Sequence, residues 1–274
     1  MARIEFVKMH GLGNDFLILD EREGDGAASS LTFAQIARLA DRRTGVGFDQ
    51  LILLQPTGAD GADFAMRIFN ADGGEVEACG NAARAVAILH GGPARVQTDG
   101  GVIGLAPDGG GAVVDMGCPR FDWEQIPLAY AMDTTAMPVS WEGLENPFAV
   151  NVGNPHVVFF VPGQDGVELE RLGPTIETDA LFPDRINVNV ASIRDDAGID
   201  LRVWERGVGL TRACGTGACA TAVAAISRGL AASPVSVHLP GGALSIAWSR
   251  GEPIMMSGPA RESYRGSFNA DDFA

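Results

Sequence analysis

Two cysteines in this chain lie in matching local sequences. The segments are Ala78-Cys79-Gly80-Asn81 and Ala213-Cys214-Gly215-Thr216, and each ends a polar turn and begins an alanine-rich stretch that predicts a helix. A helix N-terminus carries a partial positive charge, which favours the thiolate form of a cysteine. A symmetric pair of activated thiols indicates a symmetric reaction, in which a proton leaves one face of a carbon and another arrives on the opposite face. This is the chemistry of a racemase or an epimerase.

Other interpretations of the cysteines stay open at this point. A buried cysteine often packs as a small apolar residue, so the matching segments could be purely structural. Facing thiols could also form a disulfide, as in a thiol redox protein, or line the pocket of a non-catalytic amino acid binder. The cysteines form no CxxC pair, which argues against a redox protein and a disulfide framework; they are Cys79, Cys118, Cys214 and Cys219. A zinc site would need closer ligand spacing or nearby histidines, so no metal is expected.

The composition favours a cytoplasmic protein whose main partner is not nucleic acid. The 274 residues are 46% hydrophobic, which is enough for one large domain or two medium ones, and the formal net charge is -15. Nucleic acid and anionic membranes need clustered lysine and arginine, so neither is expected as the main partner. The sequence has no run of about 18 apolar residues, so no membrane-spanning helix is expected. Residues 1–6 favour a strand over a signal peptide, and a cytoplasmic location is therefore the expectation.

The similarity between the two cysteine segments extends into an internal repeat. The offset between the cysteines, 214 minus 79, is 135 residues, about half the chain. At that same offset Arg67-Ile68-Phe69 matches Arg202-Val203-Trp204, and Gly74 matches Gly209. Each half therefore predicts a strand, a polar turn, Cys-Gly and a helix. The repeat predicts two similar domains related by a pseudo-twofold axis, with the cysteines facing each other across a cleft that forms the active site.

The elements around the cysteines predict the fold class. Residues 82–90 carry a single charge, at Arg84, and residues 217–227 carry none, so both helices must be enclosed by other structure. Short strands with glycine-rich turns surround them, which is typical of curved sheets; these are residues 63–69, 94–99, 111–116, 235–239 and 243–248. Two amphipathic helices are predicted over 33–42 and 175–181. The predicted class is α/β (α+β), with two pseudo-symmetric domains, each a barrel-like β-sheet wrapped around a central apolar helix.

The predicted domains are residues 1–118 and 119–257, with a boundary inside 117–127. The C-terminal tail, residues 258–274, is predicted to return to the first domain.

The predicted helix N-termini could serve the removal of an α-proton in two ways. That carbon acid is far weaker than a thiol, so the base must be activated and the charge that grows on the carboxylate must be stabilised. Backbone N–H groups at Gly80-Asn81 and Gly215-Thr216 could bind the α-carboxylate, and the same dipoles would lower the pKa of a cysteine. The chain shows no lysine in a pyridoxal-phosphate context, so no cofactor is expected.

Eight segments, in order along nearly the whole chain, resemble the diaminopimelate epimerases. They are residues 9–16 (Met-His-Gly-Leu-Gly-Asn-Asp-Phe), 45–50 (Gly-Val-Gly-Phe-Asp-Gln), 69–73 (Phe-Asn-Ala-Asp-Gly), 78–81, 153–156 (Gly-Asn-Pro-His), 181–188 (Leu-Phe-Pro leading to Arg-Ile-Asn-Val), 205–207 (Glu-Arg-Gly) and 213–217. The resemblance implies an isomerase that works without pyridoxal phosphate. It would convert LL-2,6-diaminopimelate to the meso isomer, in lysine and peptidoglycan precursor biosynthesis.

The resemblance also implies roles for individual residues. Cys79 and Cys214 would be the paired acid and base, and His156 and Glu205 would adjust their pKa values. A homodimer is implied, with Tyr264 at its contact. The substrate would be bound by Asn14, Gln50, Asn70, Gly80, Asn81, Asn154, Asn187, Glu205, Arg206, Gly215 and Thr216.

The chemistry of these side chains suits a substrate with an amino acid group at each end. Arg206 could bind the distal carboxylate as a fork, and Glu205 could accept from an ammonium. Asn70 and Asn187 can both donate and accept. Taken singly, however, Arg206 and Glu205 could form a surface ion pair, His156 could be a buried structural histidine, and the turn asparagines could serve backbone geometry.

The chain departs from the family at three positions, Ala82, Ala85 and Asn189, which bears on substrate fit. The nearest alternative keeps the fold and the thiol pair and acts on another amino acid, as a histidine or proline-type racemase. Retention of Asn70, Asn187 and Arg206 favours diaminopimelate, because a monocarboxylate needs no distal clamp.

Overall fold

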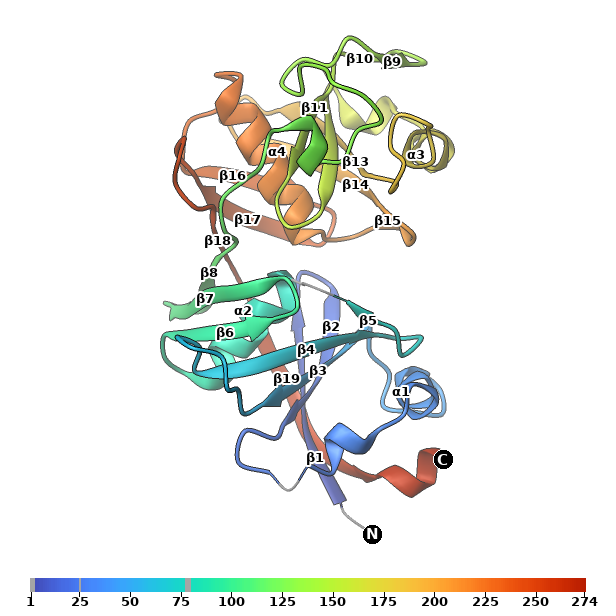
Figure 1. Cartoon of the computed structure of the whole chain (residues 1–274), viewed down its shortest axis with the longest axis vertical. Helices are drawn as coiled ribbons and strands as arrows, with labels where there is room; N and C mark the ends of the chain where they lie inside the picture. The colour runs from blue at the N-terminus through green and yellow to red at the C-terminus, as the bar shows by residue number, and fades with distance from the viewer. Residues whose placement is uncertain (1–2, 25, 77–79) are drawn as a thin grey trace. The chain divides into compact units, whose positions relative to one another are not determined.

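The computed structural model describes residues 3–24, 26–76 and 80–274, and the chain forms two compact units (Figure 1). Unit 1 comprises Met1–Val114 and Gly258–Ala274, and unit 2 comprises Asp115–Ser257. Unit 1 is therefore made from both ends of the chain, whereas unit 2 is one continuous segment.

Unit 1 contains a mixed sheet, two α-helices and two short 3-10 helices. The strands are β1 (Arg3–Gly11), β2 (Asn14–Asp20), β3 (Gln50–Gln55), β4 (Phe64–Asn70), β5 (Glu75–Val76), β6 (Ala94–Thr98), β7 (Gly101–Asp108), β8 (Gly111–Asp115) and β19 (Arg261–Asn269). The helices are η1 (Ala28–Ser30), α1 (Phe33–Ala40), α2 (Gly80–His90) and η4 (Ala270–Phe273).

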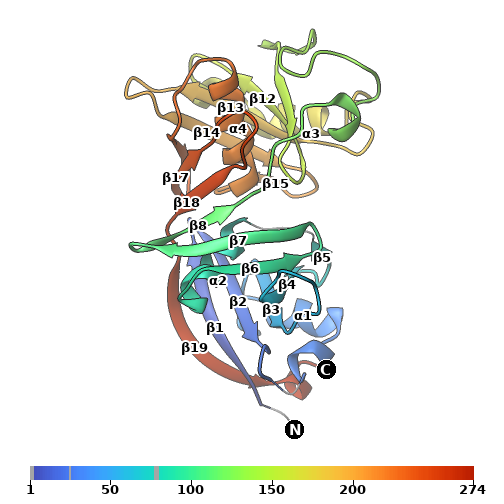
Figure 2. The same ribbon diagram turned by 60° about the vertical axis from the view of Figure 1, so that its left-hand side comes forward.

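The strands of unit 1 pair in the order β19-β1-β2-β3-β4-β6-β7-β8, and β5 folds back on β4. The β2–β3 and β4–β6 pairs are parallel, and the others are antiparallel. Figure 2 shows β19, near the end of the chain, running beside β1, near its beginning. The C-terminal segment is thus an integral strand of this sheet.

Unit 2 repeats the order of elements with small additions. Its strands are β9 (Ser140–Trp141), β10 (Leu144–Glu145), β11 (Phe148–Asn151), β12 (Pro155–Phe160), β13 (Asn187–Ile193), β14 (Ile199–Glu205), β15 (Gly209–Thr211), β16 (Val235–Leu239), β17 (Gly242–Ala247) and β18 (Met255–Gly258). Its helices are η2 (Trp123–Gln125), η3 (Gln164–Gly166), α3 (Leu169–Glu177) and α4 (Gly215–Ser227).

The pairings of unit 2 match those of β1 to β8 in unit 1, and only β19 of unit 1 has no counterpart among the described strands of unit 2. The order is β11-β12-β13-β14-β16-β17-β18, with β15 folded back on β14, and the β12–β13 and β14–β16 pairs are again the parallel ones. Leu51 pairs with Phe69 in unit 1, and Val188 pairs with Trp204 in unit 2, where Trp204 follows Phe69 by the repeat offset of 135 residues; β3 therefore corresponds to β13 and β4 to β14. The internal repeat of the sequence is therefore a repeat of sheet topology.

Each sheet curves around one central helix. In unit 2, α4 packs against strands from both ends of the order, including β11 and β17, and nearly all its residues are buried. In unit 1, α2 packs against β1, β19 and β7, and Gly80 to Ala87 are buried. A helix that is apolar on nearly every side is stable in water only when it is enclosed in this way. The predicted α/β class, with curved sheets around apolar helices, is confirmed.

The two outer helices agree with prediction to different degrees. Helix α1 begins with a capping box between Thr32 and Gln35 and ends at Ala40, close to the predicted bounds. The predicted helix over 175–181 is wrong in its bounds, because the observed α3 begins at Leu169 and ends at Glu177. The apolar stripe of α3 starts with Leu169, and Gly173 lets the helix approach Trp204, whose ring would lie 2.5 Å from a Cβ at that position.

Within residues 3–24, 26–76 and 80–274, no helix is long and apolar enough to cross a membrane. In the same ranges, no group of three or more His, Cys, Asp or Glu side chains is arranged to hold a metal ion.

Candidate active site

Cys214 lies at the N-terminus of α4, as the residue that caps the helix. Its backbone is extended, with φ -131°, and its Sγ accepts a hydrogen bond from the Gly217 N–H at 3.4 Å. The Thr216 hydroxyl lies 3.5 Å from the same sulfur. Two polar groups at the start of the helix therefore contact this thiol, and both favour its ionised form. The side chain is nevertheless almost fully buried, with 4% of the residue exposed.

Burial and a neighbouring carboxylate work against ionisation of Cys214. Burial raises the pKa of the thiol well above its ordinary value, and the charge of Glu205 raises it further. Glu205 ends β14, shares a hydrogen bond with Cys214 and accepts another from the Thr211 hydroxyl at 2.5 Å. Burial also raises the pKa of Glu205, against these two hydrogen bonds. Both effects on Cys214 favour the protonated thiol, so the prediction that the helix N-terminus lowers the pKa of this cysteine is wrong for Cys214, because burial outweighs the contacts with the helix.

Asn187 and Arg206 are held together by backbone contacts. The Asn187 amide donates to the Pro155 carbonyl at 2.8 Å, and its oxygen accepts from the Arg206 N–H at 2.9 Å. The exposed Arg206 guanidinium donates to the Asp184 carbonyl at 3.1 Å. These contacts fix the turn that begins at Arg206, so that the guanidinium projects from a rigid support.

His156 lies at the centre of a buried network in unit 2. Its Nε2 lies 2.9 Å from Asn154 Oδ1, and its Nδ1 lies 3.0 Å from the amide nitrogen of Asn189. That amide also donates to the Val157 carbonyl at 3.0 Å. Burial lowers the pKa of His156 to about 3, against the hydrogen bond from Asn189, so the ring is neutral at physiological pH. We call Asn154, His156, Asn189 and the Val157 carbonyl the His156 network.

Asn14 is held by a cluster of charges in unit 1. Its amide donates to Asp49 Oδ2 at 3.0 Å, and the Asp15 N–H donates to the same oxygen at 3.0 Å. Arg42 bridges the two carboxylates, 2.7 Å from Asp15 and 2.6 Å from Asp49, and Lys8 pairs with Asp15. Burial opposes ionisation of Asp15, but hydrogen bonds from Arg42 and Lys8 outweigh it and lower the pKa. Burial and the charge of Asp15 raise the pKa of Asp49, against a backbone hydrogen bond.

Gln50 and Asn70 lie opposite each other on β3 and β4. Gln50 Nε2 donates to Asn70 Oδ1 at 3.2 Å, and the Asn70 amide nitrogen donates to none of the described residues. The Gln50 oxygen is buried and accepts no hydrogen bond from the described residues. A donor and an acceptor therefore lie side by side, a combination that suits an ammonium beside a carboxylate.

The N-terminus of α2 contains the described part of the first cysteine segment. Cys79 itself lies outside the described residues. Gly80 and Asn81 begin the helix, and Asn81 Oδ1 accepts from the buried Arg84 guanidinium at 2.8 Å. Arg84 also donates to the Gly80 carbonyl at 3.4 Å. The guanidinium thus adds positive charge near the helix start that the apolar character of the stretch did not predict.

Tyr264 lies on β19, where it is 48% exposed. Its ring packs edge-on against Phe6, with centroids 5.9 Å apart. The residue is therefore firmly held, with its outer face available to solvent.

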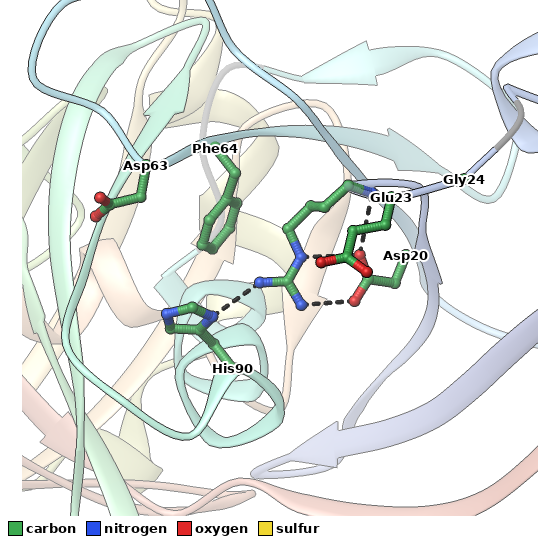
Figure 3. A pocket seen from close by; sticks show the side chains of 7 residues that line it. Asp20, Glu23, Gly24, Asp63, Phe64 and His90 are labelled. Carbon is green, nitrogen blue, oxygen red and sulfur yellow. Dashed lines mark hydrogen bonds and ion pairs between the residues drawn. The ribbon is translucent and has the colours of Figure 1, made fainter.

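One open pocket of about 680 Å³ lies elsewhere in unit 1 (Figure 3). Arg22 crosses it, donating to Asp20 at 2.6 Å and lying 2.8 Å from His90 Nδ1. None of the residues predicted to act in catalysis or binding lines this pocket. Its polar groups largely satisfy one another, so it is not the site that the sequence predicted.

Sequence reasoning missed the residues that orient the predicted ligands. Asp49 lies in residues 45–50, one of the segments that resemble the family, yet its contact with Asn14 depends on the pairing of β2 with β3. Asn189 is a departure from the family pattern, and Thr211 lies between two of the segments that resemble it. A polar residue inside an otherwise apolar strand, as at Asn189, is the signal that could have drawn attention to it.

The fold, a duplicated unit of a curved sheet around a helix, is also found in solved structures of other proteins. A structure of a phenazine biosynthesis protein of the PhzF family from Bacillus anthracis superposes with a TM-score of 0.69, covering 98% of this chain and 100% of the other. The two sequences are only 14% identical, so the similarity is one of fold.

The sequence comparisons are more specific. Residues 6–121 and 148–262 match the family model described as diaminopimelate epimerase. A diaminopimelate epimerase of Erythrobacter litoralis is 64% identical over 272 residues, covering 99% of this chain and 100% of the relative. One of Rhizorhabdus wittichii is 64% identical over 258 residues, covering 94% and 93%. The chain belongs to the diaminopimelate epimerase family.

Proposed function

We propose that this protein interconverts LL- and meso-2,6-diaminopimelate by a two-cysteine mechanism without a cofactor. The observation that carries the proposal is Cys214, a buried thiol at a helix N-terminus that contacts Glu205. Family membership supports the substrate, and the repeat of sheet topology supports a second thiol, Cys79, in the equivalent place. The two compact units would be the two epimerase domains.

In the proposed reaction the thiols act on one α-carbon from opposite faces. Cys79, as a thiolate, takes the α-proton of the LL isomer, and Cys214, as a thiol, gives its proton to the other face. The raised pKa of Cys214 supports its role as the donor in this direction. The products are a Cys79 thiol, a Cys214 thiolate and the meso isomer, so the reverse reaction uses the same pair with the roles exchanged. Two bases are needed because a single base would return the proton to the face that it left.

Stabilisation of the carbanion would come from the helix N-termini. N–H groups at Gly80-Asn81 and Gly215-Thr216 would bind the reacting carboxylate, where negative charge grows. This requires no group beyond those of the chain itself.

The distal amino acid group of the substrate would be bound by polar side chains. Asn70 would donate to the distal carboxylate, together with the Arg206 fork, while Glu205 would accept from the ammonium. Asn187 would act mainly by fixing the Arg206 turn, since both ends of its amide contact the backbone. Asn14, Gln50 and Asn154 complete the proposed set.

We further propose a homodimer with Tyr264 at the contact, and a cytoplasmic location in lysine and peptidoglycan precursor biosynthesis. A reducing compartment suits an enzyme that needs two free thiols. Size-exclusion chromatography with light scattering should give twice the chain mass for the protein, and the chain mass for Tyr264→Glu. A monomeric mass for the unsubstituted protein would contradict the dimer.

The function is tested by incubating the reduced protein with LL-diaminopimelate in deuterated water. We expect deuterium at one α-carbon and formation of the meso isomer, followed by NMR. Histidine and proline serve as competing substrates, because the alternative function is a racemase of another amino acid. Faster turnover of either would overturn the proposed substrate, and no exchange with any of them would overturn the two-cysteine mechanism.

A further inference from the structure

The direction of the hydrogen bonds in the His156 network is fixed by one backbone group, the Val157 carbonyl. The Val157 carbonyl can only accept, so the end of Asn189 that lies 3.0 Å from it must be the NH2 group. The same NH2 group lies 3.0 Å from His156 Nδ1 and donates its second hydrogen there. A backbone carbonyl therefore sets the orientation of the Asn189 amide.

The orientation of Asn189 determines the tautomer of His156. Because Nδ1 accepts a hydrogen bond, the proton of the neutral ring is on Nε2. Nε2–H then donates to the atom 2.9 Å away, which must be the Asn154 oxygen. No other arrangement makes all three of these hydrogen bonds, and the Asn154 NH2 group then donates to none of the described residues and is available to a ligand.

Unit 1 sets the equivalent asparagine the opposite way. Asn14 precedes Phe16 as Asn154 precedes His156, and both pairs stand where the corresponding strands begin. The Asp49 carboxylate accepts from the NH2 group of Asn14 at 3.0 Å, and the Asn14 oxygen accepts from no side chain that the structure describes. The two repeats thus present a donor in one unit and an acceptor in the other.

We propose that Asn189 is a positioning residue of the substrate site, which acts through His156 to present the Asn154 NH2 group to a substrate carboxylate. This rests on the proposed function, in which Asn154 binds substrate. The acceptor of Asn14 would correspondingly suit a substrate ammonium. A substrate with a carboxylate and an ammonium at each end needs both kinds of group, and the two asparagines supply them because their supports differ.

The packing around Asn189 leaves little freedom for another arrangement. Asn189 is fully buried, and its oxygen accepts no hydrogen bond from the described residues. A Cβ on Gly217 would lie 2.8 Å from that oxygen, so the first turn of α4 fits Asn189 only because residue 217 is glycine. The network is in this way built against the helix that begins at Cys214.

The test combines imidazole NMR with steady-state kinetics on the full-length protein. Long-range ¹H–¹⁵N spectra report which nitrogen of His156 carries the proton, and comparison with His156→Phe assigns the signals. Asn189→Leu removes the donor at similar volume, and Val190→Ala, on the same strand and also buried, is the matched control.

We expect the unsubstituted protein to show a neutral His156 with its proton on Nε2. In Asn189→Leu this preference should disappear and the KM for diaminopimelate should rise about tenfold, the effect of one lost hydrogen bond to a charged group, while kcat changes less. Val190→Ala should lower stability and change neither the tautomer nor KM.

Two outcomes would overturn the proposal without touching the proposed function. The first is a proton on Nδ1 in the unsubstituted protein while it epimerises diaminopimelate normally, and this result does not depend on the folding of any variant. The second is an unchanged KM in Asn189→Leu despite a changed tautomer. Absence of epimerisation in the unsubstituted protein would instead refute the proposed function.

Discussion

The two units share every strand pairing of the repeat but differ in what their sheets bury beside the central helix. In unit 1 the equivalent positions hold Phe16 and Ile52, and in unit 2 they hold His156 and Asn189, all of them fully buried. The apolar pair needs only to fill space. The polar pair needs a hydrogen-bond partner for nearly every group, because an unpaired buried polar group costs about 1–3 kcal/mol. Sheet topology therefore constrains the backbone and leaves the chemistry of the interior free to diverge.

A second difference lies at the residue nine positions before each cysteine. Asn70 precedes Cys79 by the same spacing as Glu205 precedes Cys214. A buried carboxylate raises the pKa of the thiol that it contacts, whereas an amide carries no charge to do so. The repeat could thus supply two thiols of similar placement and different acidity, which a reaction with one acid and one base requires.

The largest expected effect comes from removing either thiol. If the two halves are equivalent in chemistry, Cys79→Ala and Cys214→Ala should each reduce epimerisation at least about 10³-fold, since each removes a proton-transfer group. The assay is formation of meso-diaminopimelate from the LL isomer. Cys118→Ala, at an exposed position, is the control and should retain activity. Substantial activity in Cys214→Ala would show that only one half of the repeat supplies a base.

A smaller effect, on the pH dependence of stability, is expected from His156→Phe. This variant has in unit 2 the residue type that unit 1 has at the equivalent position, Phe16. The folded-state pKa of His156 is about 3, against 6.5 in the unfolded chain, so below pH 6.5 the unfolded state binds a proton that the folded state excludes. Stability is therefore lost as the pH falls from about 6.5 toward 3. Between pH 6.5 and about 4.5 this loss amounts to about 2 kcal/mol, and the variant should lack it.

Urea unfolding at several pH values measures this difference. His156→Phe is expected to be less stable at neutral pH, because the Asn189 and Asn154 amides lose their partner. The informative quantity is the slope of stability against pH. A slope equal to that of the unsubstituted protein would mean that His156 does not remain neutral in the folded state.

Glu205→Gln tests the asymmetry between the two cysteines. The substitution removes the charge that raises the pKa of Cys214, so this pKa should fall. The proposed mechanism needs one thiol ionised and Cys214 protonated, so the rate should depend on pH as a bell-shaped curve. The alkaline limb of that curve should move to lower pH in the variant. We also expect about a tenfold fall in kcat/KM from the lost ammonium contact. Glu170→Gln, an exposed carboxylate of α3, is the control, and an unmoved alkaline limb would exclude an electrostatic role for Glu205.

The smallest effect is expected from replacing Asp49, the carboxylate that orients Asn14. In Asp49→Asn the amide can present either end to Asn14, so the orientation of Asn14 is no longer enforced. We expect KM to rise about threefold with kcat unchanged, because a neutral amide holds Asn14 by a weaker hydrogen bond than a carboxylate does. Asp60→Asn, on the surface of the same unit, should leave KM unchanged. An unchanged KM in Asp49→Asn would indicate that Asn14 is oriented by other contacts.

Much of the fold could be predicted from local sequence. The two apolar helices have no charged face, and the strands around them have clear turns, so their bounds agree closely with the structure at β16 and α4. The start of α3 was missed because the residues that mark it, Leu169 and Leu172, lie before Pro174, and a proline usually discourages extension of a helix.

The candidate site could be predicted only in part, for a physical reason. Cys214 and its helix N-terminus are neighbours in sequence, whereas the contact of Asn189 with His156 joins residues 33 positions apart through the register of β12 and β13. The contact of Asn14 with Asp49 likewise spans 35 positions. Which end of an asparagine faces a ligand depends on such pairings, and no local pattern encodes it.

The pairing of β19 with β1 has a consequence for biosynthesis. Unit 2 is complete once residue 257 has left the ribosome, whereas β1, which is made before unit 2, must wait for residues 261–269 before its outer edge is paired. The usual order, in which the N-terminal domain folds first, is thus reversed for the final step. Until residues 261–269 emerge, β1 presents an open strand edge of the kind that promotes aggregation. A stop codon after residue 257 should therefore spare unit 2 and leave unit 1 dependent on chaperones.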